Sequence, residues 1–270
     1  MYTNTNMKQM KPSLHQQVYQ TALRNKFITS SEAKDIVGNA NTARIILSRL
    51  FGRGQLLRVR GGLYAAIPPE RVGMEYEVDR YPLIDKALGA KGALAFHSAL
   101  ELHGVAQSSF TTVFYLSEKS VRPFEFQEIL FKVIRTERLF GTMALFRNEV
   151  QLNVTDKERT FLDCIRRPDL CGGLEEYLKS FEGFVQLSPA RLLDYLERFG
   201  DLSLYQRAGF VLTLLRNELK VPEDLLEVLR SRVGKVRFPL VPGSRKDDSR
   251  LDAEWKVLVP KNLEEMTRFV

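Results

Sequence analysis

The chain has 270 residues, of which 44% are hydrophobic and 27% charged, and its formal net charge is +7. This length allows about two domains, and the composition is ordinary for a globular protein that buries a core. The absence of any run of about 18 apolar residues excludes a transmembrane helix, and the polar N-terminus lacks the apolar core of a signal peptide. We therefore expect a cytoplasmic protein that does not associate with membranes.

The net charge is unevenly distributed. Residues 1–70 contain ten Lys or Arg and three Asp or Glu, a net charge of +7. Subtracting these from the totals of 40 and 33 leaves 30 of each sign, so residues 71–270 are neutral. A basic segment beside a neutral one is typical of a protein that contacts nucleic-acid phosphates. The alternative interpretation is a small surface subdomain whose arginines are simply solvated.

Two capping boxes predict the first two helices. Ser13 is followed three residues later by Gln16, which predicts a helix that begins directly after Ser13. Thr29 is followed at the same spacing by Glu32, which predicts a second helix over 31–37. Gly38, which follows this helix, is suited to the left-handed conformation of a helix C-cap.

A third helix is predicted over 42–52, with Asn39 or Asn41 as its N-cap. One apolar stripe suits the interior, and its residues recur at helical spacing. They are Ala43, Ile46, Leu47 and Leu50. The opposite side carries Asn41, Arg44, Ile45, Ser48 and Arg49. In a DNA major groove, Arg side chains read guanine and Asn side chains read adenine, so this face favours base recognition.

A hairpin follows the third helix. The segment 55–60 alternates apolar and basic residues, with Leu57 and Val59 on one face and Arg58 and Arg60 on the other. Gly61-Gly62 supplies the positive φ angles of a tight turn, and 63–67 forms the return strand.

These elements predict a winged helix-turn-helix domain over residues 12–70. Its expected partner is double-stranded DNA. The expected DNA contacts are Asn41, Thr42, Arg44, Ile45, Ser48, Arg49, Arg53, Arg58 and Arg60.

A second domain is predicted over residues 81–270, so the fold class is α+β. The winged helix-turn-helix is followed by a mixed α/β C-terminal domain with a largely helical end. Helices are expected at 82–88, around 95–104 with Leu94 also at helical spacing, and at 155–167, 172–181, 188–200, 203–219 and 222–234. Strands are expected at 111–117, 129–134, 143–147 and 150–154. The last 35 residues are expected to lie extended on the domain, anchored by Phe238, Leu240 and Trp255.

No metal or cofactor site is predicted. His97 and His103 are six positions apart, which is not the spacing that places two ligands on one helix face. Cys164 and Cys171 are separated by six residues and have no nearby histidine, so we expect reduced thiols. The chain also has no glycine-rich phosphate loop.

One motif favours an enzyme instead. Asp252, Glu254 and Lys256 have the spacing of the acidic-x-Lys ending of many metal-dependent nucleases, and Asp169 could supply an upstream carboxylate for Mg²⁺. A second acidic pair, Asp156 and Glu158, is explained by helix capping. A nuclease therefore remains an alternative to a protein that is not an enzyme.

Three segments carry a resemblance to a known family. They are LLRVRGGLYAAIPP, ALAFHSALELHG and TDKERTFLDCIRRPDLCGGLEE, and they stand in this order within residues 15–181. Together they resemble the AbiEi family of bacterial and archaeal transcriptional regulators, the antitoxins of type IV toxin–antitoxin systems. The later segments FPLVPGSR and DAEWKV are also similar to the C-terminal part of this family.

The resemblance implies a repressor that binds inverted repeats in its own promoter through the winged domain. Its DNA contacts would fall on Arg44, Ser48 and Arg49, and on the wing at Arg58 and Arg60. The C-terminal domain would counter a partner toxin of nucleotidyltransferase type without forming a tight complex. An orphan regulator that responds to a small ligand is a further alternative.

Overall fold

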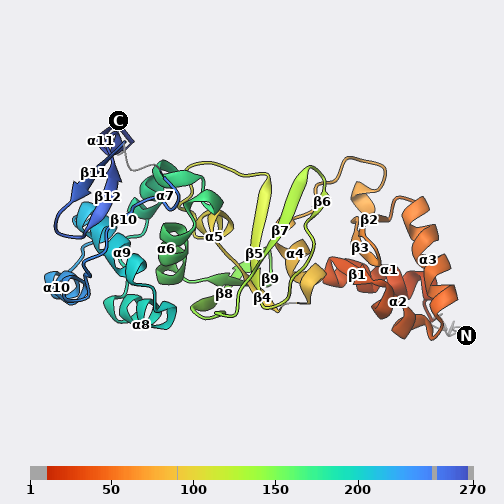
Figure 1. Cartoon of the computed structure of the whole chain (residues 1–270). Coiled ribbons are helices and arrows are strands. Elements are labelled where there is room, and N and C mark those ends of the chain that lie inside the picture. The colour runs from red at the N-terminus through yellow and green to blue at the C-terminus, as the bar shows by residue number, and fades with distance from the viewer. Residues whose placement is uncertain (1–10, 90, 245–247, 267–270) are drawn as a thin grey trace, which may run out of the picture. The chain divides into compact units, whose positions relative to one another are not determined.

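The computed structural model describes residues 11–89, 91–244 and 248–266. The chain is a mixed α+β protein that divides into two compact units, one ending at Ala87 and one beginning at Leu88 (Figure 1). From the sequence, the second domain is predicted to begin at Tyr81. The structure instead places almost all of helix α4 (Arg80–Leu88) in the first unit, where Lys86 forms an ion pair with Glu32.

In addition to α4, the first unit contains helices that surround a small sheet (Figure 1). Its elements are α1 (Leu14–Asn25), β1 (Phe27–Thr29), α2 (Ser30–Val37), α3 (Ala40–Gly52), β2 (Leu56–Arg60), β3 (Leu63–Ala66) and the 3-10 turn η1 (Pro69–Arg71). The sheet is antiparallel with the order β1-β3-β2. Strand β1 was not predicted, because three residues are too few to show an alternating pattern.

Local sequence signals position these helices as expected. Both capping boxes form, at Ser13 for α1 and at Thr29 for α2. Helix α2 ends at Gly38, whose φ angle is +79°. Of the two candidate caps for α3, Asn39 is the one used, and its Oδ1 accepts the backbone N–H groups of Asn41 and Thr42 at 2.9 and 3.0 Å.

The hairpin differs from the simple alternation that the sequence predicts. A bulge between Arg58 and Arg60 shifts the register of β2, so Leu56 and Val59 are buried while Leu57 is only half-buried. An extra residue in one strand changes which side chains face the core. Only the second glycine of the turn, Gly62, has a positive φ angle, at +76°.

The second unit contains a mixed six-stranded sheet in the order β6-β7-β5-β4-β9-β8. Its strands are β4 (Gly92–Leu94), β5 (Thr112–Ser117), β6 (Phe124–Phe126), β7 (Ile129–Arg135), β8 (Thr142–Arg147) and β9 (Val150–Thr155). The pairs β5–β7 and β4–β9 are parallel, and the other pairs are antiparallel. The four predicted strands are confirmed, and β4 and β6 are additional.

The prediction that counts Leu94 among the apolar residues of a helix is wrong. Leu94 lies in β4, where it pairs with both Tyr115 and Val154, and α5 (His97–Leu102) begins three residues later. Pairing with two neighbouring strands overrides the helical spacing of the apolar residues, because all three residues of β4 are buried.

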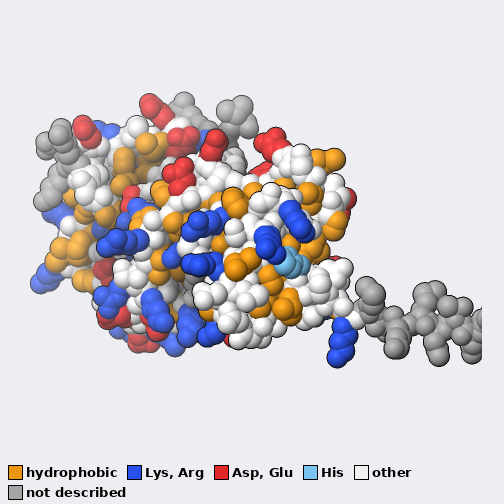
Figure 2. Space-filling view, turned by 90° about the vertical axis from the view of Figure 1, so that its right-hand side faces the viewer, with side chains coloured by type: hydrophobic (Ala, Val, Ile, Leu, Met, Phe, Trp, Pro, Cys, Tyr) orange, Lys and Arg blue, Asp and Glu red, His pale blue; other side chains and the backbone are white. Residues whose placement is uncertain are grey.

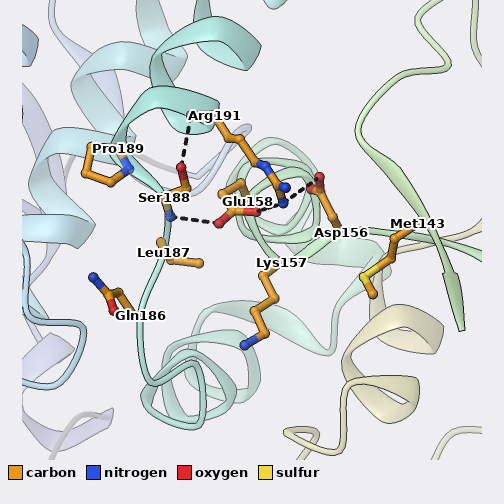
Figure 3. Close-up of a pocket in the computed structure, with 9 residues that line it drawn as sticks. All are labelled: Met143, Asp156, Lys157, Glu158, Gln186, Leu187, Ser188, Pro189 and Arg191. Atoms are coloured by element: carbon orange, nitrogen blue, oxygen red, sulfur yellow. Dashed lines mark hydrogen bonds and ion pairs between the residues drawn. The ribbon is translucent and has the colours of Figure 1, made fainter.

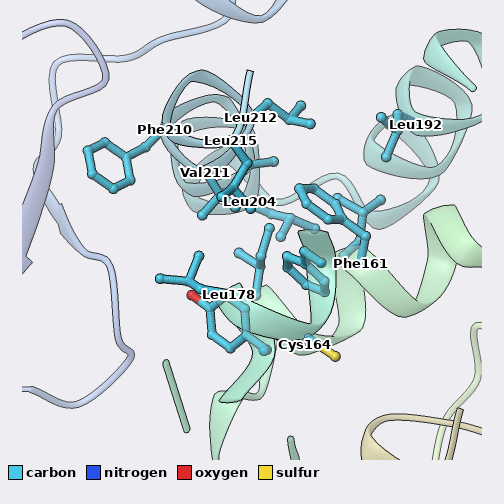
Figure 4. Close-up of a cluster of buried hydrophobic side chains, with 14 of the residues drawn as sticks. Phe161, Cys164, Leu178, Leu192, Leu204, Phe210, Val211, Leu212 and Leu215 are labelled. Atoms are coloured by element: carbon cyan, nitrogen blue, oxygen red, sulfur yellow. The ribbon is translucent and has the colours of Figure 1, made fainter. Parts of the chain in front are cut away.

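The remainder is largely helical, as expected, and packs on a shared core. Its elements are α6 (Lys157–Arg166), the 3-10 turn η2 (Pro168–Leu170), α7 (Gly173–Glu182), α8 (Pro189–Phe199), α9 (Leu202–Leu214) and α10 (Glu223–Ser231). Helices α6 and α9 lie against each other, and Phe161, Leu178, Leu204 and Val211 meet in the core between them and α7 (Figure 4). Asp156, rather than Thr155, is the N-cap of α6.

The C-terminal segment forms a second small sheet against α9. Its elements are β10 (Phe238–Pro239), β11 (Ser249–Asp252), β12 (Val257–Pro260) and the short helix α11 (Leu263–Met266). Leu240 and Trp255 are buried, as the sequence predicts, and Phe238 is half-buried. None of the helices in the described part of the chain is long and apolar enough to cross a lipid bilayer.

Candidate nucleic-acid interface

Helix α3 has one side in the core of the first unit and one side in solvent. Ala43, Ile46, Leu47 and Leu50 are all buried, as the apolar stripe predicts. They pack with residues of α1, α2 and the sheet, among them Val18, Ala33 and Leu56. The buried side of α3 therefore fixes the orientation of the helix, and the opposite side is exposed to solvent.

We call the exposed side of α3 the front face. It consists of Asn41, Thr42, Arg44, Ile45, Ser48 and Arg49, and each of these residues is exposed. Two more predicted contacts, Arg53 after α3 and Arg58 on β2, are exposed as well, whereas Arg60 is half-buried. Figure 2 looks onto the side of the first unit, and Lys and Arg side chains are spread over the visible surface.

Phe51 is an exposed residue near the front face that is not among the predicted DNA contacts. It lies in the last turn of α3, between Arg49 and Arg53, and is exposed. Its position just outside the apolar stripe of the helix is the signal that could have identified it.

Four arginines on or beside the front face have no acidic partner among the residues that the structure describes. The side chains of Arg44, Arg49, Arg53 and Arg58 form no hydrogen bond or ion pair with any other residue that the structure describes. Those of Asn41 and Ser48 are equally unengaged within the described ranges. These donors are therefore available to phosphate oxygens and base edges, which accept such groups.

The arginines of the second unit contrast with them. Most are paired with carboxylates: Arg135, Arg159, Arg166, Arg167, Arg191, Arg198, Arg216, Arg230 and Arg250. Local pairing thus neutralises most arginines of the second unit, whereas the side chains of Arg44, Arg49, Arg53 and Arg58 have no carboxylate partner among the described residues.

Several hydrogen bonds hold the hairpin and the helices of the first unit in place. The N–H of Ser30, at the start of α2, donates to the carbonyl of Gly62 in the hairpin turn at 2.7 Å. The hydroxyl of Tyr19 on α1 donates to the carbonyl of Ile67 at 2.6 Å, and burial followed by the nearby charge of Glu70 raises the pKa of Tyr19. These two hydrogen bonds therefore hold the hairpin segment to α1 and α2 in one connected framework.

Glu32 connects three elements of that framework. Its carboxylate accepts the backbone N–H and the hydroxyl of Thr29 and pairs with Lys86 on α4. Burial by itself raises the pKa of Glu32, but the hydrogen bonds from Lys86 and Thr29 lower it overall. The charged carboxylate is therefore the form that stabilises the start of α2.

A separate pocket of about 570 Å³ lies in the second unit (Figure 3). It is lined by Met143, Asp156, Lys157, Glu158, Gln186, Leu187, Ser188, Pro189 and Arg191. Arg191 lies between the two carboxylates, 3.9 Å from Asp156 and 3.7 Å from Glu158 (Figure 3).

Both carboxylates of this pocket already have structural partners. Asp156 accepts the N–H of Arg159 at 2.8 Å and the hydroxyl of Tyr195 at 2.7 Å. Burial and this hydrogen bond raise the pKa of Tyr195. Glu158 accepts the N–H of Ser188 at 2.7 Å. Capping thus accounts for Asp156, as expected, whereas Glu158 positions the loop that leads into α8.

The residues of the nuclease motif are also in structural contacts. Asp252 accepts the N–H of Trp255 at 2.8 Å, and Glu254 pairs with Arg230. Asp169 accepts two hydrogen bonds from Arg167, at 2.9 and 2.7 Å, and these lower the pKa of Asp169. Within the described ranges, no group of His, Cys, Asp and Glu side chains could hold a metal ion.

His97, His103 and the two cysteines of the second unit make structural contacts. His97 stacks on Phe110 with ring centroids 3.6 Å apart, and its Nε2 lies 3.2 Å from Glu176. Nε2 of His103 lies 2.8 Å from the carbonyl of Thr155. Cys164 and Cys171 are buried and do not form a disulfide.

The chain is similar in fold to a crystal structure of the RV2827C protein from Mycobacterium tuberculosis. The similarity covers 92% of each chain with a TM-score of 0.64, at 16% sequence identity. At this identity the similarity concerns the fold alone. No protein-family model matches the chain, and no curated protein matches it.

Proposed function

We propose that the first unit is a winged helix-turn-helix domain and that the protein is a sequence-specific DNA-binding repressor. In this proposal α3 enters the major groove, and the β2–β3 hairpin is the wing that follows the phosphate backbone. The observation that carries the proposal is the front face of α3, whose arginines are exposed and unpaired within the described residues while its back is buried.

The arrangement of the elements supports the same assignment. A helix, a short strand, two helices joined by a tight turn at Gly38 and a two-stranded hairpin follow each other along the chain. In helix-turn-helix proteins the second helix of such a pair reads base edges. An exposed arginine after α3, Arg53, and another on the hairpin, Arg58, are suited to phosphates on either side of the groove.

The test is a gel shift with the purified protein and the DNA upstream of its own gene. We expect binding that survives an excess of random competitor DNA and weakens steeply as salt is raised. Arg44→Ala and Arg49→Ala should each weaken specific binding by about 1–3 kcal/mol. Arg24→Ala is the matched control, because Arg24 is exposed on α1, away from the front face. Unchanged affinity in both test variants would contradict this placement.

We further propose that the protein acts as the antitoxin of a type IV toxin–antitoxin system. The support is the resemblance of its segments to AbiEi proteins together with a second unit that is distinct from the DNA-binding one. Co-expression with a neighbouring nucleotidyltransferase-like gene should restore growth. The Arg44→Ala and Arg49→Ala variants should restore it equally, because they leave the second unit intact. Toxicity that persists with abundant folded protein would overturn this part.

A ligand-responsive regulator is the second candidate, and the pocket beside Arg191 is the observation that favours it. A thermal-shift screen with polar metabolites would test it. A compound that stabilises the wild-type protein but not an Arg191→Ala variant would support this candidate.

A further inference from the structure

Ile45 stands out on the front face of α3. Its neighbours there are polar or charged, yet Ile45 is a large aliphatic residue and 48% of it is exposed. It takes no part in the hydrophobic core of the first unit. The hydrophobic core of the first unit therefore does not require an isoleucine at this position.

Ile45 also lies in the middle of the front face. Asn41, Ile45 and Arg49 are spaced by four residues, so their side chains follow one another along the same side of the helix. Asn41 and Arg49 carry groups that recognise adenine and guanine edges. Ile45 would thus enter the groove between two base-reading side chains.

The major groove offers an aliphatic side chain one apolar partner, the C5-methyl group of thymine. The other base edges present hydrogen-bond donors and acceptors, which an isoleucine cannot satisfy. We propose that Ile45 is a specificity-determining residue that reads the methyl group of thymine in the operator. This inference rests on the proposed function, because it requires α3 to lie in the major groove.

The spacing places the thymine relative to the other contacts. Four residues of helix advance about 6 Å, and successive base pairs are about 3.4 Å apart. The thymine is therefore expected about two base-pair steps from the bases that face Asn41 and Arg49. Each half-site of the operator should contain at least one such thymine.

Replacement of thymine by deoxyuridine tests the inference, because it removes only the methyl group and keeps base pairing. In the upstream fragment that the protein binds, each thymine is replaced in turn. We expect affinity to fall about three- to fourfold at the contacted position and to be unchanged at most others, as follows from burial of one methyl group.

The Ile45→Ala variant, combined with the uracil replacements in the DNA, shows whether Ile45 makes the contact with the methyl group. It should bind the natural fragment more weakly and should no longer distinguish thymine from uracil at the contacted position. Leu14→Ala is the matched control, because Leu14 is also an exposed aliphatic residue but lies on α1. It should keep the full response to uracil. Thermal denaturation should show that both variants are folded.

The outcomes separate this inference from the proposed function. Specific binding in which no uracil replacement matters would overturn the role of Ile45 and leave the DNA-binding function intact. A response to uracil that persists in Ile45→Ala would assign the methyl contact to another residue and also overturn it. Absence of any specific DNA binding would overturn both.

Discussion

Ile45 and Ile46 are consecutive residues of α3 with opposite surroundings: 48% of Ile45 is exposed, whereas Ile46 is 2% exposed. Ile45 lies on the front face, and Ile46 lies in the apolar stripe that packs in the core of the first unit. The same side chain therefore serves two different purposes at adjacent positions, and substitutions can separate recognition from stability.

Ile46→Ala should lower the free energy of unfolding by about 2–5 kcal/mol, because it removes buried methylene and methyl groups and leaves a cavity. Ile45→Ala should change it by less than about 0.5 kcal/mol, as is usual for surface positions. Urea denaturation of the two variants measures both values. Equal destabilisation by the two substitutions would show that Ile45 is packed in solution.

Arg58 on β2 should contact phosphate rather than bases. Arg58→Ala is expected to weaken binding about equally for specific and random DNA and to reduce the salt dependence by about one phosphate contact. Arg49→Ala should instead reduce the preference for the specific site. Binding titrations at several salt concentrations, with both kinds of DNA, distinguish the two patterns. A loss confined to specific DNA in Arg58→Ala would argue against a backbone contact.

Gly209 on α9 makes room for Trp255. A Cβ atom at Gly209 would lie 2.1 Å from Cζ3 of the indole ring, so any side chain forces α9 and the C-terminal sheet apart. Gly209→Ala should therefore destabilise the protein by about 1–3 kcal/mol through overpacking. Gly52→Ala serves as the control, because nothing lies within 4 Å of its added Cβ. Thermal or urea unfolding that ranks the two variants equally would contradict the packing described.

His103 should make the second unit sensitive to acid. Burial lowers the pKa of His103 below its usual value near 6.5, so the folded state favours the neutral ring. Its contribution to stability is complete above that usual value and is lost as the pH falls through the lower pKa of the folded state. The free energy of unfolding should therefore decrease as the pH falls below about 6.5.

The control for this pH dependence is His103→Gln, which keeps a donor for the carbonyl of Thr155 but does not titrate. This variant should be less stable at neutral pH and should show a flatter dependence just below pH 6.5. An identical slope in the wild type and the variant would assign the acid sensitivity to other groups.

Much of the first unit follows from local sequence signals. The capping boxes at Ser13 and Thr29 and the apolar stripe of α3 each depend on residues three or four positions apart. Such contacts form within one helix, so the sequence reveals them directly. The sequence also reveals the front face, because helical periodicity places its mostly polar residues opposite the apolar stripe.

Other features depend on partners that are distant in the chain. Strand β4 has only three residues and is a strand because it lies between β5 and β9. The bulge in β2 arises from its register with β3, which no alternation within β2 reveals. Similarly, Glu158 holds the N–H of Ser188, 30 residues away, rather than serving as part of a cap.

The position of the net charge and the polar face of α3 follow from the amino-acid sequence alone, because both depend on composition and helical periodicity. Which charged side chains remain available to a partner depends on the folded chain. Arg230 is neutralised by Glu254, 24 residues further along the chain, whereas no described carboxylate reaches Arg44 or Arg49. Pairing between residues so far apart in the chain depends on how the helices and strands pack. A count of charges along the sequence therefore cannot show which arginines are paired.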